Sequence, residues 1–153
     1  MNEEDVYRIA EELSLNIEPI THEYEDPAES RDNESDRSDE SWWMLSEDNE
    51  SRHLGLALLG LGADGEGAML VARQRWEWVV HELRGPLLNS KDVKRIATYD
   101  DADQEVRDVI RRRKKSLRRC ILCRQRMAPE HGGGDFGEFV CFGCQETKVG
   151  IVF

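Results

Sequence analysis

The sequence predicts a mostly α protein that ends in a small ribbon of short strands, an α+β arrangement. Apolar residues recur at helical spacing in several segments before residue 118. A segment of acidic and small polar residues separates the first of these segments from the others. Two closely spaced cysteine pairs follow the last one, in a stretch too short to fold by burying apolar surface alone. We therefore expect four or five helices, an acidic linker and a ribbon held together through its cysteines.

Residues 1–20 are expected to contain a short amphipathic helix over residues 3–15. Asn2 is a good N-cap residue, and a carboxylate follows it in the first helical turn. The apolar positions that follow the i, i+3, i+4, i+7 rule are Val6, Ile9, Ala10 and Leu13. We expect this helix to dock on the main domain. The alternative is a detachable helix that binds a partner.

Residues 21–41 are predicted to be an acidic disordered linker. From Glu25 onward they are almost wholly Asp, Glu, Ser, Arg and Asn, so burial would not compensate the entropy lost on ordering. The charge of the chain is strongly asymmetric: residues 1–50 carry a net −15 and residues 107–153 a net +6, within a total of −11. The two ends are therefore expected to meet different partners, or each other.

Residues 42–119 are predicted to form a helical domain. At its start Trp42 and Trp43 are expected to pack in the core, the alternative being a docking motif for a basic, apolar groove of a protein partner. A short helix is expected from Ser51 to Leu61, followed by a glycine-rich turn.

The segment 67–83 carries the strongest helical pattern. Its apolar stripe consists of Met69, Ala72, Trp76, Val79, Val80 and Leu83. Gly85-Pro86 then indicates a helix end. A short helix is expected to start at Ser90, and a last helix to run from Asp100 to the first cysteine.

The last predicted helix is strongly basic. Ten basic side chains lie between residues 107 and 126: Arg107, Arg111, Arg112, Arg113, Lys114, Lys115, Arg118, Arg119, Arg124 and Arg126. Such a helix can follow a phosphate backbone, because arginine binds phosphate oxygens two at a time. The residues expected to contact nucleic acid or an acidic partner are Arg111, Arg112, Lys115, Arg118 and Arg119. The alternatives are a solvated charged face and a cradle for the acidic segment of the same chain.

The only four cysteines of the chain form the pattern C-x2-C-x17-C-x2-C. A C-x-x-C turn directs two sulfur atoms at one point, and two such turns complete a tetrahedron around Zn²⁺. Because four thiolates fill every coordination position, the sequence predicts one structural zinc ion rather than a catalytic one. The expected ligands are Cys120, Cys123, Cys141 and Cys144. The alternatives, two disulfides or four free thiols, are disfavoured by the adjacent pairing and the absence of a secretory leader.

We expect residues 120–153 to form this zinc ribbon, with strands at Phe136–Val140 and Val149–Phe153. Four-cysteine spacing after a charged helix resembles the zinc finger of the DksA/TraR family, over about a third of the chain. This resemblance implies binding to bacterial RNA polymerase and an effect on transcription initiation. Members carry D-x-x-D-x-A at a coiled-coil tip. Here Asp100 and Asp103 supply D-x-x-D, and Glu105 stands where that family has alanine.

Motifs of zinc-dependent enzymes and of serine hydrolases are missing from the sequence. His22-Glu23 and His81-Glu82 lack the second histidine of H-E-x-x-H, and neither a deaminase pattern nor G-x-S-x-G occurs. We therefore expect a protein that is not an enzyme. No apolar run approaches the 18 residues of a membrane helix, and the acidic start lacks a signal-peptide pattern. A cytoplasmic location is expected, which for a viral chain means the host cytoplasm or the virion.

The function predicted from these features is that of a zinc-binding regulator or adaptor. Its basic helix and zinc ribbon would engage nucleic acid or a transcription complex such as RNA polymerase. The alternative is a zinc-stabilised structural or assembly protein, for example a component of a viral particle, that binds protein partners.

Overall fold

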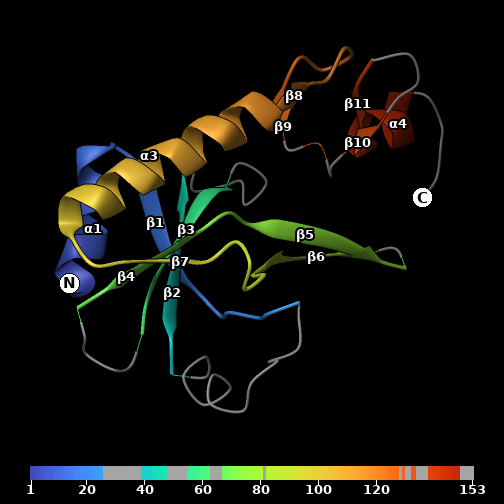
Figure 1. Cartoon of the computed structure of the whole chain (residues 1–153). Coiled ribbons are helices and arrows are strands. Elements are labelled where there is room, and N and C mark those ends of the chain that lie inside the picture. The colour runs from blue at the N-terminus through green and yellow to red at the C-terminus, as the bar shows by residue number, and fades with distance from the viewer. Residues whose placement is uncertain are drawn as a thin grey trace.

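A five-stranded antiparallel sheet forms the centre of the protein, and helices α1 (Glu3–Glu12) and α3 (Tyr99–Ser116) lie across it (Figure 1). The computed structural model describes residues 1–25, 39–47, 55–62, 67–80, 82–127, 129, 132–133 and 138–148. In spatial order the strands are β1 (Asn16–Ile20), β2 (Ser41–Ser46), β3 (Gly55–Leu61), β4 (Met69–Ala72) and β7 (Lys94–Ile96). The cysteine-containing segment lies beyond the C-terminal end of α3 (Figure 1).

The prediction of a mostly α fold is wrong, because strands outnumber helices among the described elements. The described part of the helix expected from Ser51 is β3. The helix expected over 67–83 is replaced by β4 and a hairpin, and the helix expected from Ser90 by β7. The cause is the burial of both faces of the central strands. Such strands are continuous apolar runs, which periodicity alone does not distinguish from buried helix.

Alternate side chains of each central strand enter different cores. In β2, Trp43 and Leu45 belong to the cluster beneath the helices, whereas Trp42 and Met44 belong to a cluster on the opposite face. The same alternation places Leu58 of β3 on the second face, between neighbours that lie on the first. This period of two follows from the pleat of a strand.

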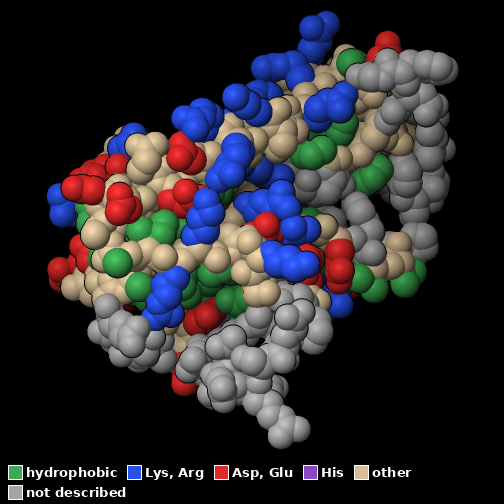
Figure 2. Space-filling view, viewed as in Figure 1, with side chains coloured by type: hydrophobic (Ala, Val, Ile, Leu, Met, Phe, Trp, Pro, Cys, Tyr) green, Lys and Arg blue, Asp and Glu red, His purple; other side chains and the backbone are tan. Residues whose placement is uncertain are grey.

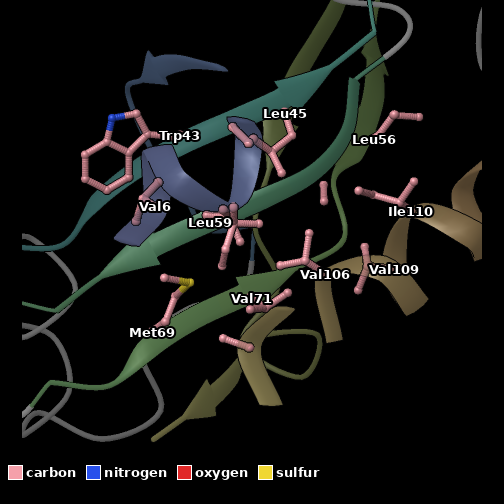
Figure 3. Close-up of a cluster of buried hydrophobic side chains, with 14 residues drawn as sticks. Val6, Trp43, Leu45, Leu56, Leu59, Met69, Val71, Val106, Val109 and Ile110 are labelled. Atoms are coloured by element: carbon pink, nitrogen blue, oxygen red, sulfur yellow. The ribbon is translucent and has the colours of Figure 1, made fainter. Parts of the chain in front are cut away.

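The first core lies between the sheet and the two helices (Figure 3). Its buried members are Val6, Ile9, Ala10, Trp43, Leu45, Leu56, Ala57, Leu59, Met69, Val71, Ala102, Val106, Val109 and Ile110. Both helices were expected from the sequence, but α1 ends at Glu12 rather than residue 15, and α3 ends at Ser116 instead of running to the first cysteine, because strand β8 follows. Asn2 caps α1 through a reciprocal capping box with Asp5, and Thr98 is the N-cap of α3. Since α1 shares this core with α3, the expectation of a docked N-terminal helix is confirmed.

The second core covers the other face of the sheet. Its buried members are Trp42, Met44, Leu58, Leu70, Ala72 and Leu88. The Trp42 indole Nε1–H donates to a Glu40 carboxylate oxygen at 2.8 Å, and the Tyr24 hydroxyl lies 2.7 Å from the same oxygen. Gly60 lies opposite Trp42, where an added Cβ would stand 2.7 Å from the indole ring. Both neighbouring tryptophans are thus buried in the core, as expected.

A hairpin of β5 (Arg75–Val79) and β6 (Glu82–Leu87) extends beside the sheet (Figure 1). Val80 lies at its turn, is 85% exposed and has a positive φ of 59°. Gly85-Pro86 lies within β6 rather than at a helix end. The base of the hairpin is held by an ion pair between the Arg75 guanidinium and Asp92, at 2.5 Å.

Most of the expected acidic linker, residues 26–38, lies outside the described residues, as do the turn at 63–66 and the expected strand at Val149–Phe153. Within the described part of the chain, no helix combines the length and apolar character needed to cross a membrane.

Replacing Leu59 by alanine tests the two-layer arrangement. Leu59 is fully buried between the sheet and the helices, so Leu59→Ala should lower the free energy of unfolding by about 2–5 kcal/mol. Val80→Ala, at the exposed hairpin turn, should change it by less than about 0.5 kcal/mol. Urea denaturation followed by tryptophan fluorescence measures both. Equal effects of the two substitutions would contradict the arrangement.

Candidate metal centre

The first cysteine pair lies in a tight turn shortly after α3. Strand β8 (Arg118–Arg119) pairs with β9 (Arg126–Met127), and the turn between them contains the pair. The Cys120 N–H donates to the Gln125 carbonyl at 3.0 Å, and the Arg124 N–H donates to the Cys120 carbonyl at 2.9 Å. Arg124 has a φ of 67°, the left-handed conformation that lets the chain reverse so sharply.

The second pair lies where a strand passes into a helix. Strand β11 (Val140–Cys141) pairs with β10 (Gly132–Gly133), and α4 (Phe142–Lys148) follows at once, with Cys144 in its first turn. The Ile121 N–H donates to the Phe139 carbonyl at 3.0 Å and so joins the two cysteine turns. The expected strand Phe136–Val140 is found only at its C-terminal end, residues 136–137 being outside the described residues.

The four sulfur atoms converge. All of them lie within 4.8 Å of one another, and those of Cys123 and Cys141 are 3.8 Å apart. Four ligands at about 2.3 Å from a zinc ion would lie about 3.8 Å apart in a regular tetrahedron. Disulfide sulfurs lie about 2.05 Å apart, and all four cysteines are free thiols here. The cluster is thus positioned to bind one metal ion and is consistent with zinc.

Backbone amides direct their hydrogens at the sulfurs. The Cys120 sulfur accepts from the N–H groups of Leu122, Cys123 and Cys141 at 3.4–3.5 Å, and the Cys141 sulfur accepts from the Cys144 N–H at 3.4 Å. Burial raises the pKa of the Cys120 thiol, but these three amides outweigh it and lower the pKa to about 6. This sulfur is therefore prepared for the thiolate state that metal ligation needs.

The other two buried cysteines have the opposite shift. Burial, together with the neighbouring sulfurs, raises the pKa of Cys144 to about 12 and also raises that of Cys141. Four thiols packed this closely cannot all ionise without a compensating cation, because like charges oppose each other in a buried site. A divalent ion supplies that compensation.

A second set of contacts holds the β10–β11 strand pair in place. The Gln145 side-chain amide donates to the Val140 carbonyl at 2.8 Å and to the Gly133 carbonyl at 3.4 Å. A Cβ on Gly132 would stand 2.5 Å from the Val140 carbonyl oxygen and 2.6 Å from the Phe139 ring. Sequence analysis did not single out these residues, because a glycine in a glycine-rich loop gives no sign of such a close approach.

The predicted basic residues are exposed, and the fold places them at three locations. Arg111 and Lys115 lie on the outer side of α3, whereas Arg112 faces a cleft beside the sheet. Arg118 and Arg119 lie on β8, next to the cysteine turn. Figure 2 shows Lys and Arg side chains along α3 toward the metal end, with acidic side chains gathered near the opposite end.

Carboxylates of the same helix accompany the first basic residues but not the last. Arg107 pairs with Asp103 at 3.0 Å and Arg111 with Asp108 at 2.7 Å. On β8, the Arg119 guanidinium instead donates to the Arg124 carbonyl at 2.7 Å, which leaves its charge uncompensated by that contact. Positive charge therefore accumulates toward the metal end of α3.

No protein-family model matches this chain, and comparisons with curated proteins and with solved structures found no similar protein. Of the expected resemblance to the DksA/TraR zinc finger, the structure supports the four-cysteine cluster suited to zinc and nothing more specific. Asp100 and Asp103 lie in the first turns of a helix that packs on a sheet, not at the tip of a coiled coil.

Substitution of Gly132 tests the architecture around the sulfurs. Gly132→Ala should weaken zinc affinity about 10- to 100-fold, because the new methyl group displaces the strand that carries Cys141. Gly133→Ala meets nothing within 4 Å and should leave affinity unchanged. Competition against a chromophoric zinc chelator measures both constants. A Gly132→Ala protein with unaltered affinity would show that the strand pair does not position the ligand.

Metal removal should affect the module and the main core differently. The cysteines form a buried cluster of their own with Phe139, sharing no member with the two sheet cores. We expect one Zn²⁺ per chain, lost in Cys120→Ser/Cys141→Ser, with the near-ultraviolet signal of the buried tryptophans retained. Elemental analysis and circular dichroism measure these quantities. Collapse of the tryptophan signal on chelation would contradict the independence of the cores.

Proposed function

We propose that this chain is a zinc-stabilised, non-enzymatic regulator or adaptor that binds nucleic acid through the outer side of α3 and the β8–β9 turn. The observation that carries the proposal is the closeness of the basic helix to the cysteine cluster, since only Leu117 and the basic strand β8 separate α3 from Cys120. The metal would hold the arginines of β8 and β9 in a fixed position relative to those of α3. Fixed, exposed arginines suit the repeated oxygens of a phosphate backbone.

The geometry of the metal site supports a role without catalysis. Four thiolate ligands leave no coordination position for water or substrate, which is typical of structural zinc. Cys120, Cys141 and Cys144 are buried, and only Cys123 is partly accessible. The zinc would thus stabilise a module that is too small to build its own apolar core.

The position of the arginines favours nucleic acid over a purely solvated face. Arg111 and Lys115 border a shallow hollow whose other lining residues are Leu13, Arg107, Ile110 and Lys114. Of these, Lys114 pairs with Glu47 at 2.6 Å. Arg118 lies 5.6 Å above the ring of Phe139, which limits the freedom of its guanidinium. Side chains that are already restricted lose less entropy when they bind phosphate.

A specific observation supports the alternative of a zinc-stabilised assembly protein. Ile121 and Leu122, at the tip of the first cysteine turn, are 46% and 39% exposed. An exposed apolar pair within a basic surface suits a protein partner with an acidic, apolar groove. Ile121→Ser, which adds no charge, would weaken such an association while leaving phosphate binding in place.

Paired substitutions on α3 test nucleic-acid binding. Arg111→Ala/Lys115→Ala should lower affinity for a 20-base-pair DNA duplex roughly 10-fold at low salt and reduce the salt slope by about two. Arg8→Ala/Arg84→Ala removes the same charge from α1 and β6 and should change affinity less than about twofold. Fluorescence anisotropy across a salt series, with a single-stranded RNA in parallel, measures both.

Equal losses in the two double variants would contradict a defined surface, since non-specific attraction depends on net charge alone. Binding that ignores salt would contradict phosphate recognition altogether. Neither double variant removes a metal ligand or a core residue, so zinc content and the near-ultraviolet signal of the buried tryptophans together serve as the controls for folding.

A further inference from the structure

A cleft of about 480 Å³ lies between α3, the end of β4 and the loop before β7. It is distinct from the outer side of α3 and from the cysteine cluster. Its lining residues are Arg73, Gln74, Lys91, Asp92, Lys94, Glu105, Val109, Arg112, Arg113, Ser116 and Pro129. Five basic and two acidic side chains give it a net charge of +3. The volume is typical of a small-molecule site.

Two carboxylates organise the cations around this cleft. Asp92 lies 3.1 Å from the Arg73 guanidinium and 2.5 Å from that of Arg75. Glu105 lies 3.1 Å from the Lys94 ammonium and 3.3 Å from the Arg112 guanidinium. Each carboxylate bridges two cations and so fixes their positions. Arg75 also lies 3.6 Å from Glu25, so the excess positive charge of the cleft comes from its other basic residues. The cations come from the sheet side and from α3, and an anion between them would contact both.

The carboxylate of Asp92 remains ionised in this setting. Partial burial raises its pKa, but hydrogen bonds from Arg75 and Arg73 lower it further, and the result lies below the ordinary value. The ionised bridge is therefore present at neutral pH, and the cations that it holds are already in place before any ligand arrives. Such preorganisation reduces the entropy lost on binding.

The cleft also contains a polar group that lacks a partner. Gln74 is 6% exposed, its amide N–H donates to the Gly55 carbonyl, and its Oε1 has no hydrogen-bond partner in the described part of the chain. A buried acceptor left unpaired costs about 1–3 kcal/mol. The oxygen is shielded from the cleft, so a ligand N–H or O–H would reach it only after the Gln74 side chain turns toward the cleft that it lines.

From these features we infer that the cleft binds a phosphorylated small molecule that also carries hydrogen-bond donors, such as a nucleotide or a sugar phosphate. The phosphate lies among Arg73, Lys91, Lys94 and Arg112, and the donor reaches toward Gln74. A cleft walled by strand, loop and helix suits a compact phosphate compound better than a duplex backbone, which needs an open surface. The site would give the protein a metabolite-binding function separate from nucleic-acid binding.

The test uses isothermal titration of the full zinc-loaded chain with ADP, ribose 5-phosphate and inorganic phosphate. We expect saturable binding of at least one of the two organic phosphates at one site per chain, more tightly than inorganic phosphate. Lys91→Glu should weaken it at least 10-fold. Lys115→Glu makes the same charge change on the outer side of α3 and should alter it less than twofold.

Gln74→Met separates recognition of the donor from recognition of the phosphate. It should weaken binding of the organic phosphate and leave binding of inorganic phosphate unchanged. The unchanged binding of inorganic phosphate also shows that the cleft remains folded. Absence of saturable binding for all three probes, or equal effects of the Lys91 and Lys115 variants, would overturn the inference. If the DNA duplex displaces the organic phosphate, and Lys91→Glu also weakens binding of the duplex, the cleft belongs to the nucleic acid. That result would equally overturn the inference.

Discussion

The apolar stripe of α3 positions every candidate functional group in this protein. Ala102, Val106, Val109 and Ile110 lie on one side of the helix and pack against β3 and β4. Because that stripe faces the sheet, the basic residues of α3 point either outward or toward the edge of the sheet. The C-terminal end of the helix then sets the starting point of β8, and through it the place of the cysteine cluster. Loosening this contact would displace the basic surface, the cleft and the metal site together.

Two different stabilising principles meet at Ser116, the end of α3. Before it, apolar side chains are buried on both faces of a sheet, and the hydrophobic effect holds the layers together. After it, the strands are two residues long and the buried cluster consists of three cysteines and Phe139. So little apolar surface does not compensate the entropy of ordering a chain, so we expect the module to need a bound metal for its stability.

Local chemistry was predictable from the sequence, and the long-range pairing was not. The cysteine spacing predicted the sulfur cluster, and the Asn2 cap with its apolar stripe predicted α1, because these features depend on neighbours within a few residues. The strands were not predicted, for a physical reason. In the segment 69–72 every side chain is buried, alternately on two faces, so no polar position reveals the period of two. The cleft was also missed, since its cations come from segments 73–94 and 112–113, which only the fold brings together.

The arrangement of carboxylates gives the two basic surfaces different properties. On the outer side of α3, Asp103 and Asp108 each pair with one arginine of the same helix, contacts that solvent screens and that are individually weak. In the cleft, Asp92 and Glu105 each bridge two cations, and both carboxylates are only 16% exposed. The cations themselves are similarly exposed on both surfaces: Arg73, Lys94 and Arg112 are 58–64% exposed, and Arg107 and Arg111 are 47% and 63% exposed. The two surfaces therefore differ in the arrangement of their charges rather than in screening. Cations from two sides of the cleft can contact one phosphate together, whereas those along the outer side of α3 follow one helix and suit an extended polyanion.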